Sequence, residues 1–291
     1  MYFSIQSRPT IALLLIVRDE VDIVAQCISW HLNRGIDCAL IIDNGSTDGT
    51  RDILSQYDAA DDNILVFDEP EGFDKPGWWK RMATIAREKY HADWVLPIDA
   101  DEFWFAKDSD YRSELKGPAN VITSSWRNMI PDPGKNWTEF DHYGNVLNYS
   151  HTFRKNLVAC HDSLVLDRGN HEPQRENLVQ KLSDNLIVYH YPVRSWEQFE
   201  KKVRRAARVI ALNPDEHPYL SFHWKRWHSL REQDKLKALF DQVVGQRCGV
   251  CTYDPTMKML LGNRDFIGSN LRHTQDKTTL VASQLHPLAI P

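Results

Sequence analysis

The sequence predicts an α/β fold with a single, mostly parallel β-sheet flanked by helices, followed by a helical C-terminal extension. Short apolar runs at 11–17, 39–42, 64–67 and 94–98 alternate with longer segments of helical periodicity. Runs that are apolar at every position indicate strands buried on both faces, as in parallel sheets. Polar residues follow three of these runs directly, and such sheets bind ligands beyond the carboxyl ends of their strands.

The composition is that of an ordinary globular protein, with 42% hydrophobic and 26% charged residues among 291. A net charge of -5 gives no reason to expect nucleic acid as a partner. No stretch approaches the roughly twenty apolar residues of a membrane span. Five scattered cysteines favour a reducing compartment. We therefore expect a cytoplasmic protein, with peripheral contact to the inner face of the membrane left open.

The first strand, 11–17, leads into a helix that Gly35 is placed to end. Four residues share its inner stripe: Val24, Cys27, Ile28 and His31. The second strand, 39–42, is followed by 43–50, in which nearly every residue is of a type that favours turns. Ser46 or Asp48 can cap the helix that follows.

The third strand, 64–67, is followed by a helix over 79–90 and by the fourth strand at 94–98. Strands that alternate with helices predict right-handed crossovers in a parallel sheet. Further on, 128–149 is rich in Pro, Gly, Asn and aromatics, and a connection of this length is typically functional or mobile. A strand resumes at 186–189.

A strong helix begins after Ser195, because Ser195 and Gln198 form a capping box. Shorter helices follow, one of them over 232–244. We expect a first domain over 1–212, and over 213–291 a helical extension with a tail.

The fourth strand ends in the acids Asp99, Asp101 and Glu102. On extended backbone, Asp99 and Asp101 would point to the same side. Carboxylate oxygens in that arrangement suit Mg2+ or Mn2+ shared with substrate phosphates. An isolated D-x-D is more often a solvated loop, but here the upstream strands and turns lie in the order that a ligand site requires.

Three segments in this order resemble the nucleotide-sugar-dependent glycosyltransferases of family 2, which have the GT-A fold: 17–20, 43–50 and 99–103. The segment 190–199 resembles a sub-branch related to family 92. The likeness covers roughly 11–210, and the combination is more specific than any one motif.

The resemblance implies a role for each matching residue. Asp43 would hydrogen-bond the nucleobase, and three residues would line the nucleoside pocket: Val17, Arg18 and Glu20. Asp99 would face the ribose or the metal, and Asp101 would hold the divalent ion. Glu102 would orient the acceptor. The asparagine of the Asp43–Asn44 pair departs from the acidic pair usual in the family.

The resemblance also implies that His190 joins the metal shell, with His171 and His223 as rival ligands. Three basic residues follow that could neutralise the departing nucleoside diphosphate: Arg194, Lys202 and Arg205. A basic helix face of this kind is ordinarily a solvated surface.

Inverting transfer also needs a general base, generally a carboxylate. The sequence offers Glu172, with Asp141 and Asp132 in the long connection as alternatives.

We therefore expect a metal-dependent, inverting glycosyltransferase that moves a sugar from a nucleotide donor, such as a UDP-sugar, to a glycan or glycolipid. Bacterial capsule or lipopolysaccharide assembly would be a fitting setting. One alternative is a nucleotidyltransferase that makes sugar nucleotides, although 11–20 lacks the glycine that its phosphate loop needs. A second is a non-catalytic glycan-binding protein on a degenerate transferase fold, which would have lost the metal carboxylates.

Overall fold

The computed structural model describes residues 8–144, 154–167, 169–170, 172–212, 222–245 and 251–262. These residues form two compact units. The first takes in 8–126 and 154–188, and the second takes in 127–144 and the described residues from 189 onwards. None of the described helices combines the length and the apolar character needed to cross a bilayer. The expected domain boundary at residue 212 stays a prediction.

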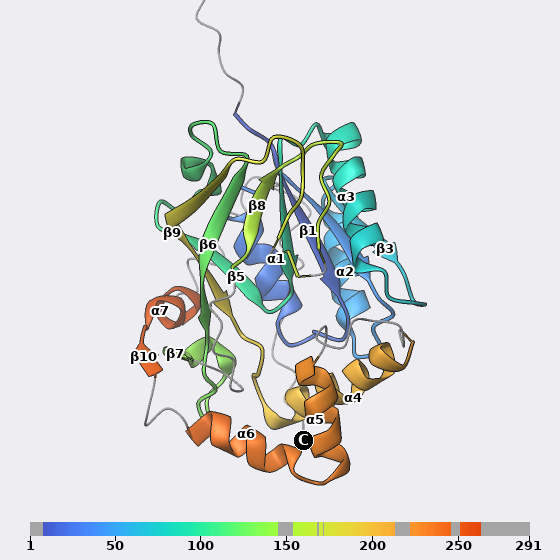
Figure 1. Cartoon of the computed structure of the whole chain (residues 1–291), viewed down its shortest axis with the longest axis vertical. Coiled ribbons are helices and arrows are strands. Elements are labelled where there is room, and N and C mark those ends of the chain that lie inside the picture. Colours follow the sequence, from blue (N-terminus) through green and yellow to red (C-terminus); the bar gives the residue numbers. More distant parts are fainter. Residues whose placement is uncertain are drawn as a thin grey trace, which may run out of the picture. The chain divides into compact units, whose positions relative to one another are not determined.

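The N-terminal half of the first unit alternates strands and helices as the sequence predicts (Figure 1). Its elements are β1 (Ile11–Val17), α1 (Val24–Leu32), β2 (Cys38–Asp43), α2 (Thr50–Ala60), β3 (Ile64–Asp68), α3 (Lys75–Tyr90) and β4 (Trp94–Asp99). The strands β3, β2, β1 and β4 lie side by side in that order, and all pair in parallel. Their carboxyl ends therefore meet at one edge of the sheet.

The sheet continues beyond β4 with strands that the sequence signals less clearly. The chain adds β5 (Glu102–Ala106), the 3-10 helix η1 (Tyr111–Glu114), β6 (Val121–Asn128), β8 (Asn156–Ala159) and β9 (Gln180–His190). The full order is β3-β2-β1-β4-β8-β6-β9-β5, and β8 is antiparallel to both β4 and β6. The predicted α/β class, a mostly parallel sheet flanked by helices, is confirmed (Figure 1).

Every residue of β1 is buried, as expected for a central parallel strand. Alternate residues of β1, Ala12, Leu14 and Ile16, belong to one apolar core with Trp79 and Met82 of α3. The other residues of β1 face the opposite side of the sheet, because strand side chains alternate. Two buried faces explain why the apolar pattern of this strand is continuous.

The second unit has a helical core of its own. It contains the 3-10 helix η2 (Trp137–Glu139), β7 (His142–Gly144), α4 (Trp196–Leu212), α5 (Phe222–Glu232), α6 (Leu236–Gly245), β10 (Cys251–Tyr253) and α7 (Thr256–Gly262). Phe199 of α4 packs edge-on against Trp227 of α5, in a cluster that also includes Val203 and Leu239. Strands β7 and β10 pair in antiparallel fashion.

Several element boundaries differ from the predicted ones. Helix α3 begins at Lys75, four residues before the predicted Trp79, because the Asp74 side chain caps it by accepting from the Gly77 amide at 3.0 Å. Strand β9 begins six residues before the predicted 186, with a polar and largely exposed first half that carries no apolar signal. The long connection after residue 128 contains η2 and β7.

Candidate active site

The polar ends of β1 and β2 are joined by side chains that bind backbone groups of the other loop. Asp19, a buried residue with a left-handed φ of 51°, accepts from the Thr47 amide at 2.6 Å. The Asp19 amide donates to Ser46 Oγ at 2.9 Å, and the Glu20 amide donates to Thr50 Oγ1 at 2.9 Å. The turn residues of 43–50 therefore hold the loop after β1 in one conformation.

Asp43, the last residue of β2, is 3% exposed. Its Oδ2 accepts from the Ser46 amide at 2.9 Å. No described residue offers a hydrogen bond to Asp43 Oδ1, which is also buried. A buried carboxylate oxygen with this open capacity suits a ligand N–H group.

Asn44 does not share that role, because its amide nitrogen donates to the Glu69 carbonyl at 2.6 Å and to the Gly72 carbonyl at 3.3 Å. The asparagine that departs from an acidic pair therefore fixes the loop after β3, whereas Asp43 alone keeps a carboxylate oxygen open to a ligand.

The acids after β4 lie in a tight turn. β4 ends at Asp99 and β5 begins at Glu102, so Ala100 and Asp101 form the turn between them. The extended backbone expected across Asp99 and Asp101 is not observed, because Ala100 and Asp101 are turn residues. Asp101 is 3% exposed and Glu102 1% exposed. Two of the three carboxylates are therefore buried, whereas the Asp99 side chain is 33% exposed.

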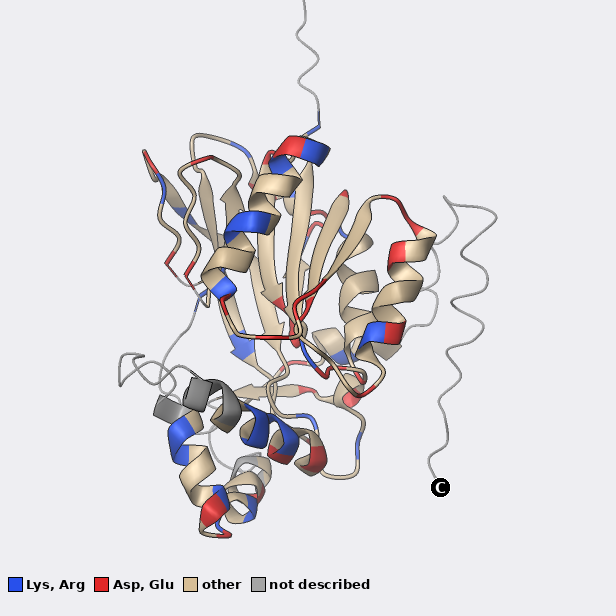
Figure 2. Ribbon diagram, turned by 90° about the vertical axis from the view of Figure 1, so that its right-hand side faces the viewer, with Lys and Arg blue, Asp and Glu red and all other residues tan. Residues whose placement is uncertain are grey.

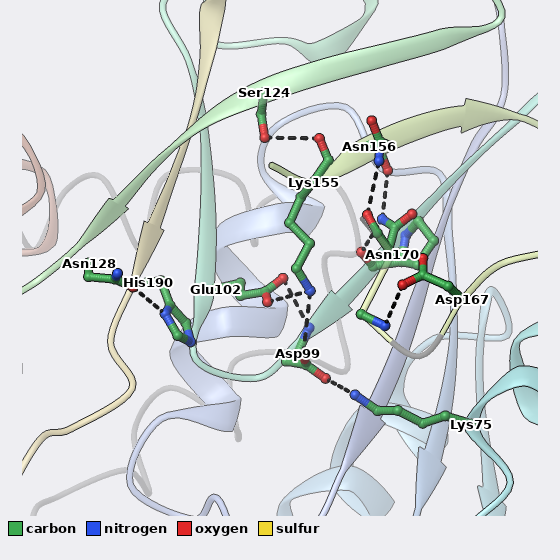
Figure 3. Close-up of polar contacts among 12 residues, drawn as sticks. Lys75, Asp99, Glu102, Ser124, Asn128, Lys155, Asn156, Asp167, Asn170 and His190 are labelled. Atoms are coloured by element: carbon green, nitrogen blue, oxygen red, sulfur yellow. Dashed lines mark hydrogen bonds and ion pairs between the residues drawn. The ribbon is translucent and has the colours of Figure 1, made fainter. Parts of the chain in front are cut away.

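Two lysines bind this acid turn (Figure 3). Lys155 Nζ lies 2.7 Å from Glu102 Oε1 and 3.5 Å from Asp99 Oδ2, and its side chain is only 4% exposed. Lys75 Nζ lies 2.5 Å from Asp99 Oδ1. The Asp99 amide also donates to Glu102 Oε2 at 3.3 Å. Asp99 thus interacts with two ammonium groups.

The pKa values of the acid turn reflect these charges. Burial would raise the pKa of Asp99, but Lys75 and Lys155 together hold it below its ordinary value. Burial, with the charges of Asp99 and Asp101, raises the pKa of Glu102 against the influence of Lys155. Burial opposes the charged form of Lys155, but Glu102 and Asp99 raise its pKa above that of an ordinary lysine. The neighbouring carboxylates therefore favour the charged form of Lys155.

A second segment is tied to the end of β4 by Asn170. Its amide nitrogen donates to the Pro97 carbonyl at 3.1 Å and to the Asn156 carbonyl at 2.8 Å. Asn156 Nδ2 donates back to the Asn170 carbonyl at 3.0 Å (Figure 3). Two residues later, Glu172 is exposed. His171 lies outside the described residues, as does the side chain of His223.

The remaining candidate residues lie in the second unit. His190 ends β9, and its Nδ1 is 2.7 Å from Asn128 Oδ1. With that oxygen as acceptor, Nδ1 carries the ring proton and Nε2 is the basic nitrogen. Arg194 is buried and donates to the Tyr191 carbonyl at 3.1 Å. Lys202 and Arg205 lie on α4, where Lys and Arg are frequent (Figure 2).

The two alternative bases of the long connection are held in ion pairs. Asp141 is 2.7 Å from His142 Nδ1 and 2.8 Å from Lys258 Nζ, and Lys258 and His142 lower the pKa of Asp141 to about 2 against the effect of burial. Asp132 is 2.6 Å from Lys135 Nζ. Both carboxylates are largely buried.

Sequence reasoning missed Lys75, Lys155 and Asn170, and it gave Asp19 no role of its own within the segment 17–20. Lys75 and Lys155 are separated from the acids by 24 or more residues, and no spacing rule links them to the acids. A usable signal existed for Asn170, because Gly-Asn dipeptides favour turns and asparagine tolerates left-handed backbone. Asn170 has a φ of 54°.

Comparison with known proteins gives one family and several distant likenesses. The sequence model of the family described as "Glycosyl transferase family 2" matches residues 14–162, slightly more than half of the chain. The putative teichuronic acid biosynthesis glycosyltransferase TuaG of Bacillus subtilis is 26% identical over an alignment of 136 residues, and the match covers 44% of this chain and 50% of that protein. The chain thus spans about half the length of the curated relative that it matches.

Two solved structures resemble the chain at low sequence identity. The mannosyltransferase PcManGT from Pyrobaculum calidifontis, in complex with GDP-Man and Mn2+, has a TM-score of 0.45 and 13% identity. The likeness covers 95% of this chain and 84% of that one. S. aureus TarS 1-349 has a TM-score of 0.41 and 12% identity, with 82% of each chain covered.

Proposed function

Because the chain belongs to glycosyl transferase family 2, we propose that it transfers a sugar from a nucleotide-sugar, most simply a UDP-sugar, to a glycan or glycolipid acceptor. The observation that carries the proposal is the buried acidic edge of the parallel sheet. There Asp43 ends β2, and Asp99, Asp101 and Glu102 surround the end of β4. Parallel α/β sheets bind ligands at this edge.

Asp43 supplies the contact that selects the nucleotide. Its open Oδ1 accepts the N–H of a base such as uracil, while Oδ2 stays on the Ser46 amide. Val17, Arg18 and Glu20 line the nucleoside on the neighbouring strand end. Hydrogen bonds already fix these loops to each other. Donor binding therefore costs little conformational entropy, which favours affinity.

In the transfer step, the acceptor hydroxyl oxygen forms a bond to the anomeric carbon. The bond between that carbon and the β-phosphate oxygen breaks, and the nucleoside diphosphate leaves with the electron pair. The hydroxyl proton passes to a carboxylate base. The anomeric centre inverts because the hydroxyl attacks from the face opposite to the leaving diphosphate. Growing charge on the diphosphate is stabilised by basic side chains, for which Lys75, Arg194, Lys202 and Arg205 are the candidates.

We assign the general base to Glu172 rather than to Glu102 or Asp141. Glu172 is exposed on the segment that Asn170 anchors. Glu102 is buried against Lys155, and Asp141 is engaged by Lys258 and His142. An exposed carboxylate can reach an acceptor hydroxyl without first breaking a buried ion pair.

The residues present fit a divalent ion, because the turn after β4 offers hard carboxylate oxygens. Asp101 is the main candidate ligand, with Asp99 and His190 as further ones. The hydrogen bond of His190 Nδ1 to Asn128 is the kind that orients an imidazole whose other nitrogen binds metal. Bound Mn2+ or Mg2+ would stabilise the charge of the leaving diphosphate.

The finer placement in a sub-branch related to family 92 rests on the segment 190–199. In the structure this segment runs from the end of β9 into α4. The Gln198 amide donates to Ser195 Oγ at 3.1 Å, and the Arg194 amide donates to Gln198 Oε1 at 3.1 Å. Serine and glutamine of the motif therefore have a helix-capping role, which leaves His190 and Arg194 as its candidates for contact with substrate.

Calorimetric titration with UDP, GDP and their sugar conjugates, with Mn2+ and with EDTA, tests the proposal on wild type and Asp43→Asn. The substitution can keep an acceptor on the Ser46 amide while it turns the open oxygen into a donor. We expect metal-dependent binding of one nucleotide and a loss of about 10- to 100-fold in Asp43→Asn, as for hydrogen bonds to charged groups.

The matched control is Asp62→Asn, at an exposed position in the loop before β3. Its nucleotide affinity is expected to equal that of the wild type. Absence of binding by every nucleotide in the presence of Mn2+ would refute the proposed function.

A further inference from the structure

Lys155 is buried among carboxylates. Its side chain is 4% exposed, and the ammonium group is 2.7 Å from Glu102 and 3.5 Å from Asp99. The charge also lies 5.7 Å from the ring centroid of Trp126, within the range of a cation–π interaction. A buried ammonium group is costly unless it is paired. Here Glu102 and Asp99 provide that pairing, so the position suits a cation.

The lysine is fixed from its backbone outward. The Lys155 carbonyl accepts from the Ser124 amide at 2.9 Å and from Ser124 Oγ at 3.1 Å. The next residue, Asn156, begins β8, which pairs with both β4 and β6. Lys155 therefore enters the acid turn from the residue that directly precedes a sheet strand, and its backbone is fixed by Ser124.

Without Lys155, the buried carboxylates of Asp101 and Glu102 would repel each other and the partly exposed Asp99, for which Lys75 would be the remaining ammonium partner. A divalent cation can relieve this repulsion, and so can a fixed ammonium group. From these contacts we infer that Lys155 is a resident cation, which holds Asp99 and Glu102 in place before any ligand binds.

This inference rests on the proposed function in one respect, that the acid turn takes up a divalent ion. Lys155 is a positioning residue in this scheme, because it acts through the carboxylates it holds. The ammonium charge should therefore weaken the binding of a divalent ion, compared with a site that had the three carboxylates and no lysine. Removal of the ammonium group should therefore strengthen metal binding rather than weaken it.

The test is Mn2+ binding without nucleotide, by calorimetry and by the Mn2+ electron paramagnetic resonance signal, on wild type and Lys155→Met. We expect Lys155→Met to bind Mn2+ at least about tenfold more tightly, because one repelling charge has left a poorly solvated site. Mn2+ should also raise the Tm of the variant by more than that of wild type.

Two controls separate charge from packing. Lys155→Met/Glu102→Gln removes both charges of the pair and should show no gain in Mn2+ affinity. Lys181→Met removes a lysine that lies 3.2 Å from Glu114, elsewhere in the first unit, and should leave Mn2+ binding as in wild type.

The inference is overturned when Lys155→Met binds Mn2+ no more tightly than wild type. It is also overturned when Lys155→Met stays unfolded in Mn2+, because the metal then cannot replace the ammonium group. Recovery of the folded variant only in Mn2+ supports it. Since nucleotide is absent, failure of wild type to bind any nucleotide would refute the proposed function and leave this result standing.

Discussion

Asn170 shows how one side chain can fix a loop at the site. It is 1% exposed, adopts left-handed backbone, and binds two carbonyl groups through its amide nitrogen. One of these carbonyls belongs to Pro97, two residues before Asp99. The segment that carries Glu172 is thereby tied to the strand that ends in the acid turn.

Replacement of Asn170 separates the contributions of its side chain and its backbone. Asn170→Gly tolerates the positive φ and loses only the hydrogen bonds, so we expect a loss of about 2–4 kcal/mol in unfolding free energy from two stranded carbonyl groups. Asn170→Ala should lose about 1 kcal/mol more, because alanine disfavours left-handed backbone. Urea denaturation at pH 7 measures both, and equal losses would show that the backbone conformation contributes nothing.

At the scale of the elements, side chains of α1 bind backbone groups of the edge strand β5. Trp30 Nε1 donates to the Trp104 carbonyl at 2.7 Å, and His31 Nε2 is 3.3 Å from the Trp104 amide. His31 Nδ1 is 2.7 Å from the Cys27 carbonyl, so Nδ1 carries the proton and Nε2 accepts. A second ring proton would face the Trp104 N–H, which explains why this histidine must stay neutral.

The pH dependence of stability follows from this arrangement. Burial lowers the pKa of His31 from 6.5 to about 3. Below pH 6.5 this histidine is protonated in the unfolded state, whereas in the folded state it stays neutral down to about pH 3. Stability therefore falls as the pH falls through that window. Each pH unit well inside the window costs on the order of 1 kcal/mol.

Urea denaturation of wild type and His31→Gln between pH 7 and pH 4 checks this expectation. The wild type should be the more stable at pH 7, and its advantage should shrink towards pH 4, because glutamine does not titrate. An advantage that stays constant over this range would show that the His31 pKa is not lowered on folding.

Whether an element could be predicted from the sequence depends on whether its signal is local. β1, β2 and β4 were predicted because burial on both faces requires continuous apolar runs. β5 was missed because it begins within the acids, at Glu102. The acids themselves were found, since a strand end that turns polar is visible in sequence. Lys155 was not, because its partners are brought to it only by the pairing of β8 with β4.

At the scale of the whole molecule, the two units have separate apolar cores. Leu14 of β1 belongs to the core of the first unit and Phe199 of α4 to the core of the second. Both side chains are at most 1% exposed. Distinct cores suggest that the units open separately, because cooperative units tend to coincide with contiguous packing.

Native-state hydrogen exchange of Phe199→Ala and Leu14→Ala tests this independence. Each substitution should cost about 3–5 kcal/mol in its own core, as is usual for cavities of this size. We expect Phe199→Ala to lower the protection of α4 and α5 amides while those of β1 and β2 keep theirs, and Leu14→Ala to do the reverse. Equal loss of protection in both units after either substitution would show that they unfold as one.

The pairing of Lys155 with Glu102 also couples the acid turn to the docking of β8. The acids leave the ribosome more than fifty residues before the lysine. Lys155 reaches them only when β8 docks beside β4, since Asn156 begins that strand. Until then, Lys75 can pair with Asp99, but Glu102 lacks its ammonium partner. Docking of β8 and completion of the acid turn are thus coupled, because the residue that pairs with Glu102 directly precedes β8.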